Sequence, residues 1–510
     1  MVLLTELPPE ILQHVLGFVD PPDLAWIPRI CKSFYHTVAG NTSLFRAVYL
    51  NNFDNPTDRS AVNWEQDLKN AVRLQIICRR ENVEDKKNDL PFVYDTVTAL
   101  LRNAATDTDR VKSTTHPSSL NADLLSAIFK QETNQSAFLR RSFIYERARG
   151  ECSIDNQVEA ARREDHQKSA HLHCLYGVPV LYAHSESHRT RRSRMSPFAC
   201  SKVYDIRQYT ENTMWGPFMD DDTGRVDWEK VEAIMVVIGS NLRKLGLTKF
   251  PVCRNFWEMP FAGTWPHSYK PIPIPTSHEP GPLDLQDPYG VTGMWLRVVC
   301  FLDYTDFFAY NFNSAENPPP RHIPRPAIDV GEATRLILMK LRVTKIEPPG
   351  PEDGQALPVV FFEGISRSLD NSFDENANSD LRGSVRLTPE GEVRWTTFSV
   401  FSGVERWRSE NVQVGGVRSA KGVLGNWFDK DYDPRGPVGP TAFWKVSDKV
   451  TESTSYRALT HDFLPLIQGH FDEAPDEYDP EQSDDDEGDD DEPGLELEIT
   501  GISWVTWTED

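Results

Sequence analysis

The chain has 510 residues, enough for two or three domains, and 11% of them are aromatic, which can supply a sizeable core. Its formal net charge of −23 disfavours a nucleic-acid partner, because like charge opposes contact with phosphates. Seven scattered cysteines without CxxC spacing indicate reduced thiols, and no apolar run approaches the length of a membrane span. The N-terminus lacks a signal-peptide pattern, so we expect the cytoplasm, the nucleus or both, without a membrane partner.

The first 40 residues predict three short helices. Pro8 and Pro9 followed by Glu10 make a favourable helix start, because proline is tolerated at the first helical position and a carboxylate suits the positive end of the helix dipole. Apolar residues recur at helical spacing up to Val19, and the helix is expected to end at Asp20, before two prolines.

Two further helices are expected near Asp23 and around Phe34, with Pro28 between them. Three helices this short cannot bury a self-sufficient core. We therefore expect something outside the segment to cover their apolar stripe.

The same residues resemble the F-box. Leu7-Pro8, a glutamate, paired aliphatic residues, the Asp20-Pro21 turn, Asp23-Leu24 and the Cys31-to-Phe34 run follow one another in the order of that motif. The resemblance implies a three-helix F-box at 1–50 that binds the Skp adaptor and, through it, a cullin scaffold and a RING subunit. The residues expected to contact the adaptor are Leu7, Pro8, Ile11, Leu12, Val15, Leu16, Leu24, Ile30 and Phe34. The alternative is an ordinary helical hairpin docked on the rest of the chain.

A helical linker is expected at 60–200, where it would act as a spacer. Amphipathic or helix-favouring stretches lie at 64–80, 93–105, 121–129 and 159–176. In the first of them, Leu68, Val72, Gln75 and Ile76 are expected to share one face of an amphipathic helix.

A substrate-recognition domain that contains a β-barrel is expected at 201–450. Turn residues there separate short strand-like segments at 293–301, 336–346, 357–365, 384–387, 393–401, 406–414, 422–428 and 442–446. This spacing favours a closed antiparallel barrel or, alternatively, a β-sandwich, so the fold class is α+β. Glycines between Gly415 and Gly425 suit bends at barrel corners. The stretches 412–416, 427–429 and 443–444 also resemble the lipocalin-like barrel that some F-box proteins use as a substrate receptor.

The C-terminal region divides into an acidic part and an apolar part. Residues 472–492 hold 14 acidic residues and no basic ones, which predicts a disordered acidic tail at 470–493. Residues 494–510 alternate with period two, and we expect a strand that returns to a folded sheet.

No catalytic constellation is evident, so we expect no enzyme activity, no catalytic residues and no cofactor. The chain has no nucleophile elbow, phosphate loop or zincin motif. His166, His171, His173 and Cys174 share one helical segment but cannot converge on a tetrahedral metal site, so no metal is expected.

Tryptophan and arginine dominate binding hot spots, which makes the aromatic and basic residues of the β region candidates for substrate contact. The candidates are Trp295, Arg297, Arg406, Arg418, Lys421 and Trp427. Arg418 and Lys421 are the strongest because they lie in a glycine-rich connection, and loop tips at barrel mouths carry recognition.

The combined pattern indicates a substrate-recognition subunit of an SCF-type ubiquitin ligase that selects an unknown protein target through its β domain. Two alternatives stay open, a barrel that binds a small apolar ligand and an F-box scaffold that acts outside the ligase. A short arginine cluster at 189–194 is also compatible with nuclear import.

Overall fold

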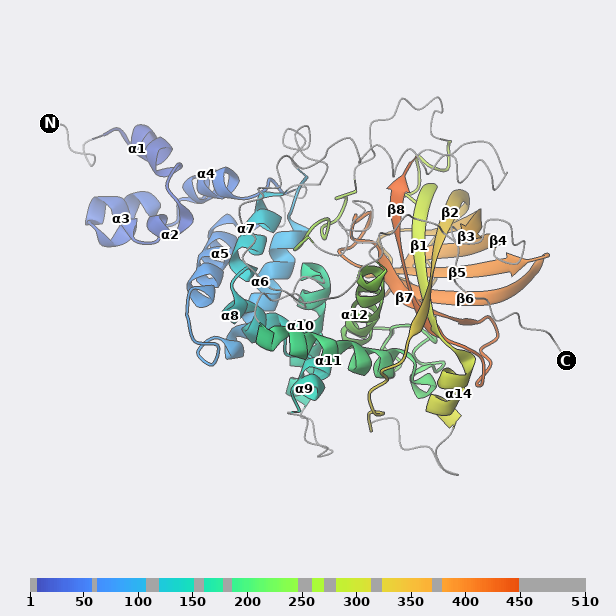
Figure 1. The fold of residues 1–510 in the computed structure, drawn as a ribbon. Helices are drawn as coiled ribbons and strands as arrows, with labels where there is room; N and C mark the ends of the chain where they lie inside the picture. Colours follow the sequence, from blue (N-terminus) through green and yellow to red (C-terminus); the bar gives the residue numbers. More distant parts are fainter. Residues whose placement is uncertain are drawn as a thin grey trace, which may run out of the picture.

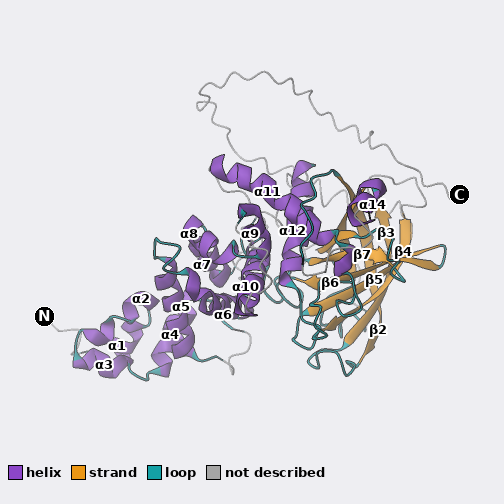
Figure 2. Ribbon diagram, turned by 90° about the horizontal axis from the view of Figure 1, so that it is seen from below, coloured by secondary structure: helices purple, strands orange, loops and turns teal. Residues whose placement is uncertain are grey.

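The computed structural model describes residues 7–56, 62–106, 119–150, 160–177, 186–245, 259–269, 281–312, 323–368 and 378–448. Short N-terminal helices lie at one end, a larger group of helices lies in the middle and a β-barrel lies at the other end (Figures 1 and 2). The predicted acidic segment at 470–493 and the predicted strand at 494–510 lie outside the described residues.

The three predicted N-terminal helices are confirmed. They are α1 (Pro9–Leu16), α2 (Pro21–Leu24) and α3 (Lys32–Val38), with a 3₁₀ turn, η2 (Ile27–Arg29), around Pro28. A fourth helix that the pattern did not predict, α4 (Thr42–Asn52), begins at Asn41, whose side chain accepts a hydrogen bond from the Leu44 amide. Leu44 and Val48 of α4 are fully buried, so α4 supplies part of the cover that the three short helices need.

The middle of the chain folds into further helices, and the four that were predicted are confirmed as α5, α6, α7 and α10. The helices are α5 (Trp64–Cys78), η3 (Lys87–Asp89), α6 (Leu90–Arg102), α7 (Leu120–Phe129), α8 (Glu132–Asn134), η4 (Gln135–Leu139), α9 (Phe143–Arg149), α10 (Ala160–Tyr176), α11 (Glu186–Val203), η6 (Ile206–Gln208), α12 (Trp228–Lys244) and, between two strands, α14 (Tyr304–Phe312). Within these described stretches, no helix has the length and apolar character needed to cross a membrane.

The predicted apolar face of α5 is only partly covered, with Leu68 and Val72 buried. Ile76 is 54% exposed and Gln75 is half-buried, whereas Ala71, Leu74 and Ile77 are completely or almost completely buried. Helix α5 packs against α4 and α6, and those neighbours decide which side of its apolar surface is covered.

Helix α12 joins the helical region to the barrel. It packs on α10 and α11 and also on strands β1, β7 and β8, and its residues from Val231 to Gly239 are all buried (Figure 1). One apolar core therefore runs from the N-terminal helices through the helical region to the outer face of the barrel.

A buried carboxylate strengthens this junction. Glu332, at the start of β2, accepts hydrogen bonds from the Tyr204 hydroxyl and from Asn241 Nδ2 at 2.9 Å. Burial raises the pKa of Glu332, which favours the protonated carboxyl.

The eight predicted strands are confirmed, and they form a closed barrel, so the sandwich alternative is wrong. The strands are β1 (Gly293–Leu302), β2 (Glu332–Glu347), β3 (Val359–Ser368), β4 (Asn378–Leu387), β5 (Val393–Phe401), β6 (Val404–Gln413), β7 (Val423–Asp429) and β8 (Gly439–Ser447). Each pairs antiparallel with the next, and β8 returns to β1, where Val298 lies opposite Ala442. That last pairing removes the exposed edges that a sandwich would retain.

The middle helices also contain a buried histidine whose titration should affect stability. His171 stacks on Trp228 with ring centroids 3.5 Å apart, and its Nδ1 is 2.9 Å from the Tyr94 hydroxyl. Burial lowers the pKa of His171 to about 3, well below the ordinary value near 6.5. Between these two values the unfolded chain binds a proton at this residue and the folded chain does not.

Stability should therefore fall as the pH decreases from 6.5, and H171F should show a shallower decrease than the wild type. Between pH 6.5 and pH 4.5, the wild type should lose about 2.5 kcal/mol more unfolding free energy than H171F does. Urea unfolding at pH 6.5, 5.5 and 4.5 measures it, with H36F on the exposed surface of α3 as the matched control. Parallel pH profiles for H171F and the wild type would contradict the prediction.

Candidate functional site

The predicted adaptor-contact residues fall into two groups. Leu12, Leu16, Leu24 and Phe34 are between 2% and 7% exposed and belong to the core that holds the N-terminal helices together. These four side chains therefore offer almost no surface to a partner, although Leu24 also forms part of the wall of a groove described below. They can support a docking surface mainly indirectly, because their packing holds the N-terminal helices in place.

The second group is on the surface. Ile11 is 50% exposed, Val15 41% and Ile30 67%, while Pro8 is exposed and Leu7 is half-buried. These side chains present apolar area to solvent.

Three exposed aromatic residues were missed by the sequence analysis. Phe18 is 68% exposed, Trp26 63% and Tyr35 54%. Phe18 follows Ile11 and Val15 at helical spacing, so the continued stripe could have identified it. No sequence pattern identifies Trp26 and Tyr35 as exposed. An aromatic residue is usually assigned to the core from its sequence, and only its neighbours in the folded structure show that it is on the surface.

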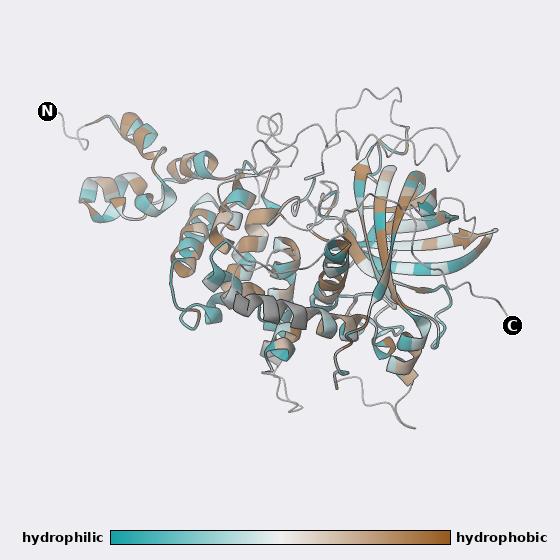
Figure 3. Ribbon diagram, viewed as in Figure 1, coloured by the Kyte–Doolittle hydropathy of each residue, from teal (hydrophilic) through white to brown (hydrophobic). Residues whose placement is uncertain are grey.

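The exposed apolar side chains are concentrated in this segment. Of the twelve large hydrophobic residues that are exposed in the described part of the chain, six lie between residues 11 and 35. Figure 3 shows brown apolar segments on these N-terminal helices. A concentration of this kind marks an interaction surface rather than scattered single exposures.

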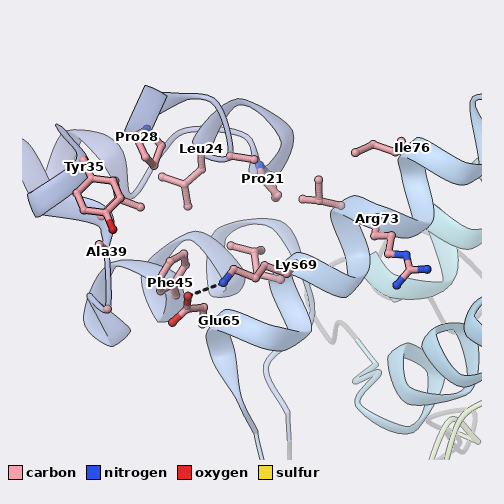
Figure 4. A pocket seen from close by; sticks show the side chains of 15 residues that line it. Pro21, Leu24, Pro28, Tyr35, Ala39, Phe45, Glu65, Lys69, Arg73 and Ile76 are labelled. Carbon is pink, nitrogen blue, oxygen red and sulfur yellow. Dashed lines mark hydrogen bonds and ion pairs between the residues drawn. The ribbon is translucent and has the colours of Figure 1, made fainter. Parts of the chain in front are cut away.

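A groove continues this surface onto α5. It has a volume of about 460 Å³ and lies between α2, α3 and α4 on one side and α5 on the other (Figure 4). Its lining is mainly apolar and includes Pro21, Leu24, Tyr35, Phe45, Leu68, Val72 and Ile76, with Lys69 and Arg73 from α5 also present. Lys69 forms an ion pair with Glu65 at 2.6 Å. The three apolar residues of the predicted α5 face, Leu68, Val72 and Ile76, thus line this groove.

Arg418 and Lys421 do not form a free loop tip. The connection between β6 and β7 is covered by residues 259–269, and the amides of His267 and Tyr269 donate to the carbonyls of Val417 and Arg418. Lys421 is 2% exposed, and burial lowers its pKa to about 7. The glycines between β6 and β7 indicated a loop, but only the tertiary structure shows that another segment covers it.

The other barrel candidates do not gather on one surface. Trp295 and Arg297 are buried and point into the barrel, whereas Arg406 is exposed. Trp427 is half-buried, donates from Nε1 to the Cys300 carbonyl and packs edge to face on Trp407. The structure therefore does not bring the six predicted substrate residues together.

The histidines of α10 have separate partners. His166 lies 3.1 Å from Glu146, His173 lies 2.6 Å from Glu232, and His171 lies next to Tyr94. Among the described residues, no group of three or more histidine, cysteine or acidic side chains is arranged to hold a metal ion.

A comparison with protein families identifies the N-terminal helices. The F-box-like family model matches residues 4–51. These residues form an F-box-like domain. F-box domains bind Skp-type adaptors, so the exposed apolar side chains between residues 11 and 35 lie within a domain whose family docks on a partner. Neither the comparison with curated proteins nor the comparison with solved structures finds a match.

The F-box-like domain and the eight-stranded barrel together fit an F-box protein with a C-terminal barrel.

Proposed function

We propose that this chain is a substrate-recognition subunit of an SCF-type ubiquitin ligase. The observation that carries the proposal is the concentration of exposed apolar side chains within the F-box-like domain. Burial of such side chains contributes about 1.5–3 kcal/mol each, so a few of them supply a stable interface. The Skp-type adaptor would cover Ile11, Val15, Phe18, Trp26 and Ile30, and would connect the chain to the cullin and RING subunits.

The adaptor is also the proposed occupant of the groove between the F-box-like domain and α5. Tyr35 is one of the six exposed apolar residues and also lines the groove, so the two surfaces are continuous. The lining is mainly apolar, and its charged residues Glu65 and Lys69 pair with each other, so the groove suits an apolar segment of the adaptor.

The position of the barrel supports a role in target selection. Helices packed in one continuous core separate the F-box-like domain from the barrel, which lies at the far end of the molecule (Figure 1). A packed connection of this kind holds a bound target at a defined distance from the adaptor. Ubiquitin transfer would then be accelerated by proximity, because the target is held near the conjugating enzyme, and the conjugating enzyme would form the new bond. The proposed location is the cytoplasm, the nucleus or both.

Reconstitution tests the proposal. The purified full chain is mixed with a Skp-type adaptor and then with a cullin–RING complex, and assembly is followed by size-exclusion chromatography with light scattering. Co-elution of all four subunits is expected. A chain that binds the adaptor but excludes the cullin would instead support an F-box scaffold outside the ligase, and a chain that binds neither would overturn both readings.

Targets can be sought separately by proximity labelling in proteasome-inhibited cells, with the full chain and with a chain that lacks the F-box-like domain. Proteins captured by both chains and stabilised when the gene is removed are the expected substrates. Capture that disappears with the F-box-like domain would count against target selection by the barrel.

A further inference from the structure

The connection between β6 and β7 contains an arginine in an unusual backbone conformation. Arg418 has a φ of +54°, in the left-handed region where residues other than glycine are uncommon. It precedes Ser419, whose amide donates to the Gly416 carbonyl at 3.2 Å and closes a tight turn. Arg418 is the third residue of this turn, where a positive φ normally favours glycine. A side chain at such a position carries a conformational cost, and strained residues of this kind cluster at functional sites.

A neighbouring segment holds this conformation in place. The Tyr269 amide donates to the Arg418 carbonyl at 3.1 Å, and the Ala420 amide donates to Ser268 Oγ at 2.8 Å. The backbone on both sides of the Arg418 side chain is therefore fixed by the folded structure. The direction in which the side chain leaves the backbone is fixed with it.

The guanidinium of Arg418 lies against Gly290. A Cβ atom on Gly290 would come within 2.8 Å of Arg418 Nε and 3.3 Å of Nη2, so a larger residue there would displace the arginine side chain. Arg418 as a whole is half-buried, and part of it remains in contact with solvent. Two positions of the fold, the strained backbone at 418 and the glycine at 290, thus accommodate one arginine side chain that a partner can reach.

This guanidinium has no partner of opposite charge. Among the described residues, the Arg418 side chain forms no hydrogen bond and no ion pair. The charged side chain beside it is another cation, Lys445, whose Nζ donates to the Gly290 carbonyl at 2.8 Å and pairs with Asp448. Burial lowers the pKa of Lys445, and the positive charge of Arg418 acts in the same direction.

The other carboxylate in this region is Asp287. Its oxygens accept hydrogen bonds from the amides of Tyr289 at 2.8 Å and Val291 at 2.6 Å, and burial raises its pKa. Asp448 is used by Lys445 and Asp287 by backbone amides, which leaves the single charge of Arg418 unmatched. A partly desolvated cation without a counter-charge is costly, and such groups are normally paired.

We propose that Arg418 binds a single carboxylate on an acidic side chain of the protein target. This inference rests on the proposed role of the barrel in target selection. The planar guanidinium matches a carboxylate and can donate two parallel hydrogen bonds to it. Because one positive charge is unmatched, a carboxylate with one negative charge fits the site better than a phosphate group with nearly two. The conformational cost at Arg418 is then offset when the target binds.

An array of random short peptides with amidated C-termini, probed with the purified full chain, tests this proposal. Peptides that bind should be enriched in aspartate and glutamate, and R418Q should lose this enrichment. R406Q removes an exposed arginine of β6 and should select the same peptides as the wild type. Absence of acidic enrichment in the wild type, or an unchanged selection by R418Q, would overturn the proposal.

Calorimetric titration of the strongest peptide then identifies the contact. R418Q should weaken binding at least about tenfold, and R418K several-fold, because lysine keeps the charge but cannot donate in the same paired geometry. Glutamine in place of the peptide's glutamate should weaken binding as much as R418Q does, and should have no further effect on the R418Q chain. Additive losses, or tighter binding of a peptide with phosphoserine in place of the glutamate, would contradict the assignment.

R418G separates binding from a structural role. Glycine relieves the left-handed backbone, so the melting temperature should be unchanged or higher, while the peptide affinity should fall as in R418Q. A lower melting temperature in both R418G and R418Q would show that the arginine serves the fold and would overturn the proposal. These assays contain neither adaptor nor cullin, so acidic selectivity and ligase assembly can fail independently of each other.

Discussion

Replacement of Ile11 and Val15 together by aspartate is expected to abolish binding of the Skp-type adaptor without unfolding the chain. Both side chains are largely exposed in the structure, at 50% and 41%, so a charge at either position disturbs little of the core. If the adaptor covers the exposed half of each side chain, their loss removes about 1.5–3 kcal/mol of binding free energy, and two carboxylates at the interface add a desolvation cost, so Kd should rise by at least roughly 10- to 10²-fold. Calorimetry with purified adaptor measures Kd, and the melting temperature reports on the fold.

The matched control carries aspartates at Leu285 and Val404, which are 75% and 65% exposed on the barrel side of the molecule. This control introduces the same charge change and should bind the adaptor as the wild type does. Wild-type affinity in the I11D/V15D chain would show that the adaptor docks elsewhere. Equal losses in both variants would point to a general charge effect and would also count against the proposed surface.

The largest expected effect on stability comes from Trp395, which lies in the core inside the barrel. Its side chain is fully buried, donates from Nε1 to Gln413 Oε1 at 3.1 Å, and packs on Trp295, Phe362 and Phe443 with ring centroids 5.1–5.7 Å apart. W395A removes these contacts, leaves a cavity and deprives Gln413 of its donor. The free energy of unfolding should fall by about 3–5 kcal/mol.

Urea unfolding followed by circular dichroism measures this loss. W26A is the matched control, since Trp26 is 63% exposed and its removal should change the unfolding free energy by less than about 0.5 kcal/mol. The core around Trp395 inside the barrel is separate from the core that contains the N-terminal helices, so W395A should retain adaptor binding under native conditions. A W395A chain as stable as the wild type would contradict the packing described here.

The barrel could be predicted because its strands are local features. Alternating apolar residues, such as those around Trp395 and Val423, and the turn residues between strands give a signal that depends on a few neighbouring positions. Closure could be proposed from the number of strands, but the pairing of Val298 with Ala442 joins residues 144 apart and is visible only in the structure. Helix α4 was missed because its stripe is weak and its buried face is defined by the helices it covers.

The candidate site divides in the same way. The motif predicted that residues from Leu7 to Phe34 form one functional segment, and the family comparison places residues 4–51 in an F-box-like domain. The motif could not separate Leu12, which is in the core, from Ile11, which is on the surface, because both are aliphatic residues of one stripe. The burial of Lys421 could not be predicted for a similar reason, since the segment that covers it lies about 150 residues earlier in the chain.

The sequence by itself thus determined the F-box motif, four of the middle helices and the eight strands, because helix and strand propensities arise from interactions between nearby residues. The tertiary structure decided which apolar residues remain exposed on the F-box-like domain, how α12 joins the helices to the barrel, and that Arg418 lies half-buried without a counter-charge among the described residues. Exposure and pairing depend on residues far apart in the chain, and only the folded arrangement brings those residues together.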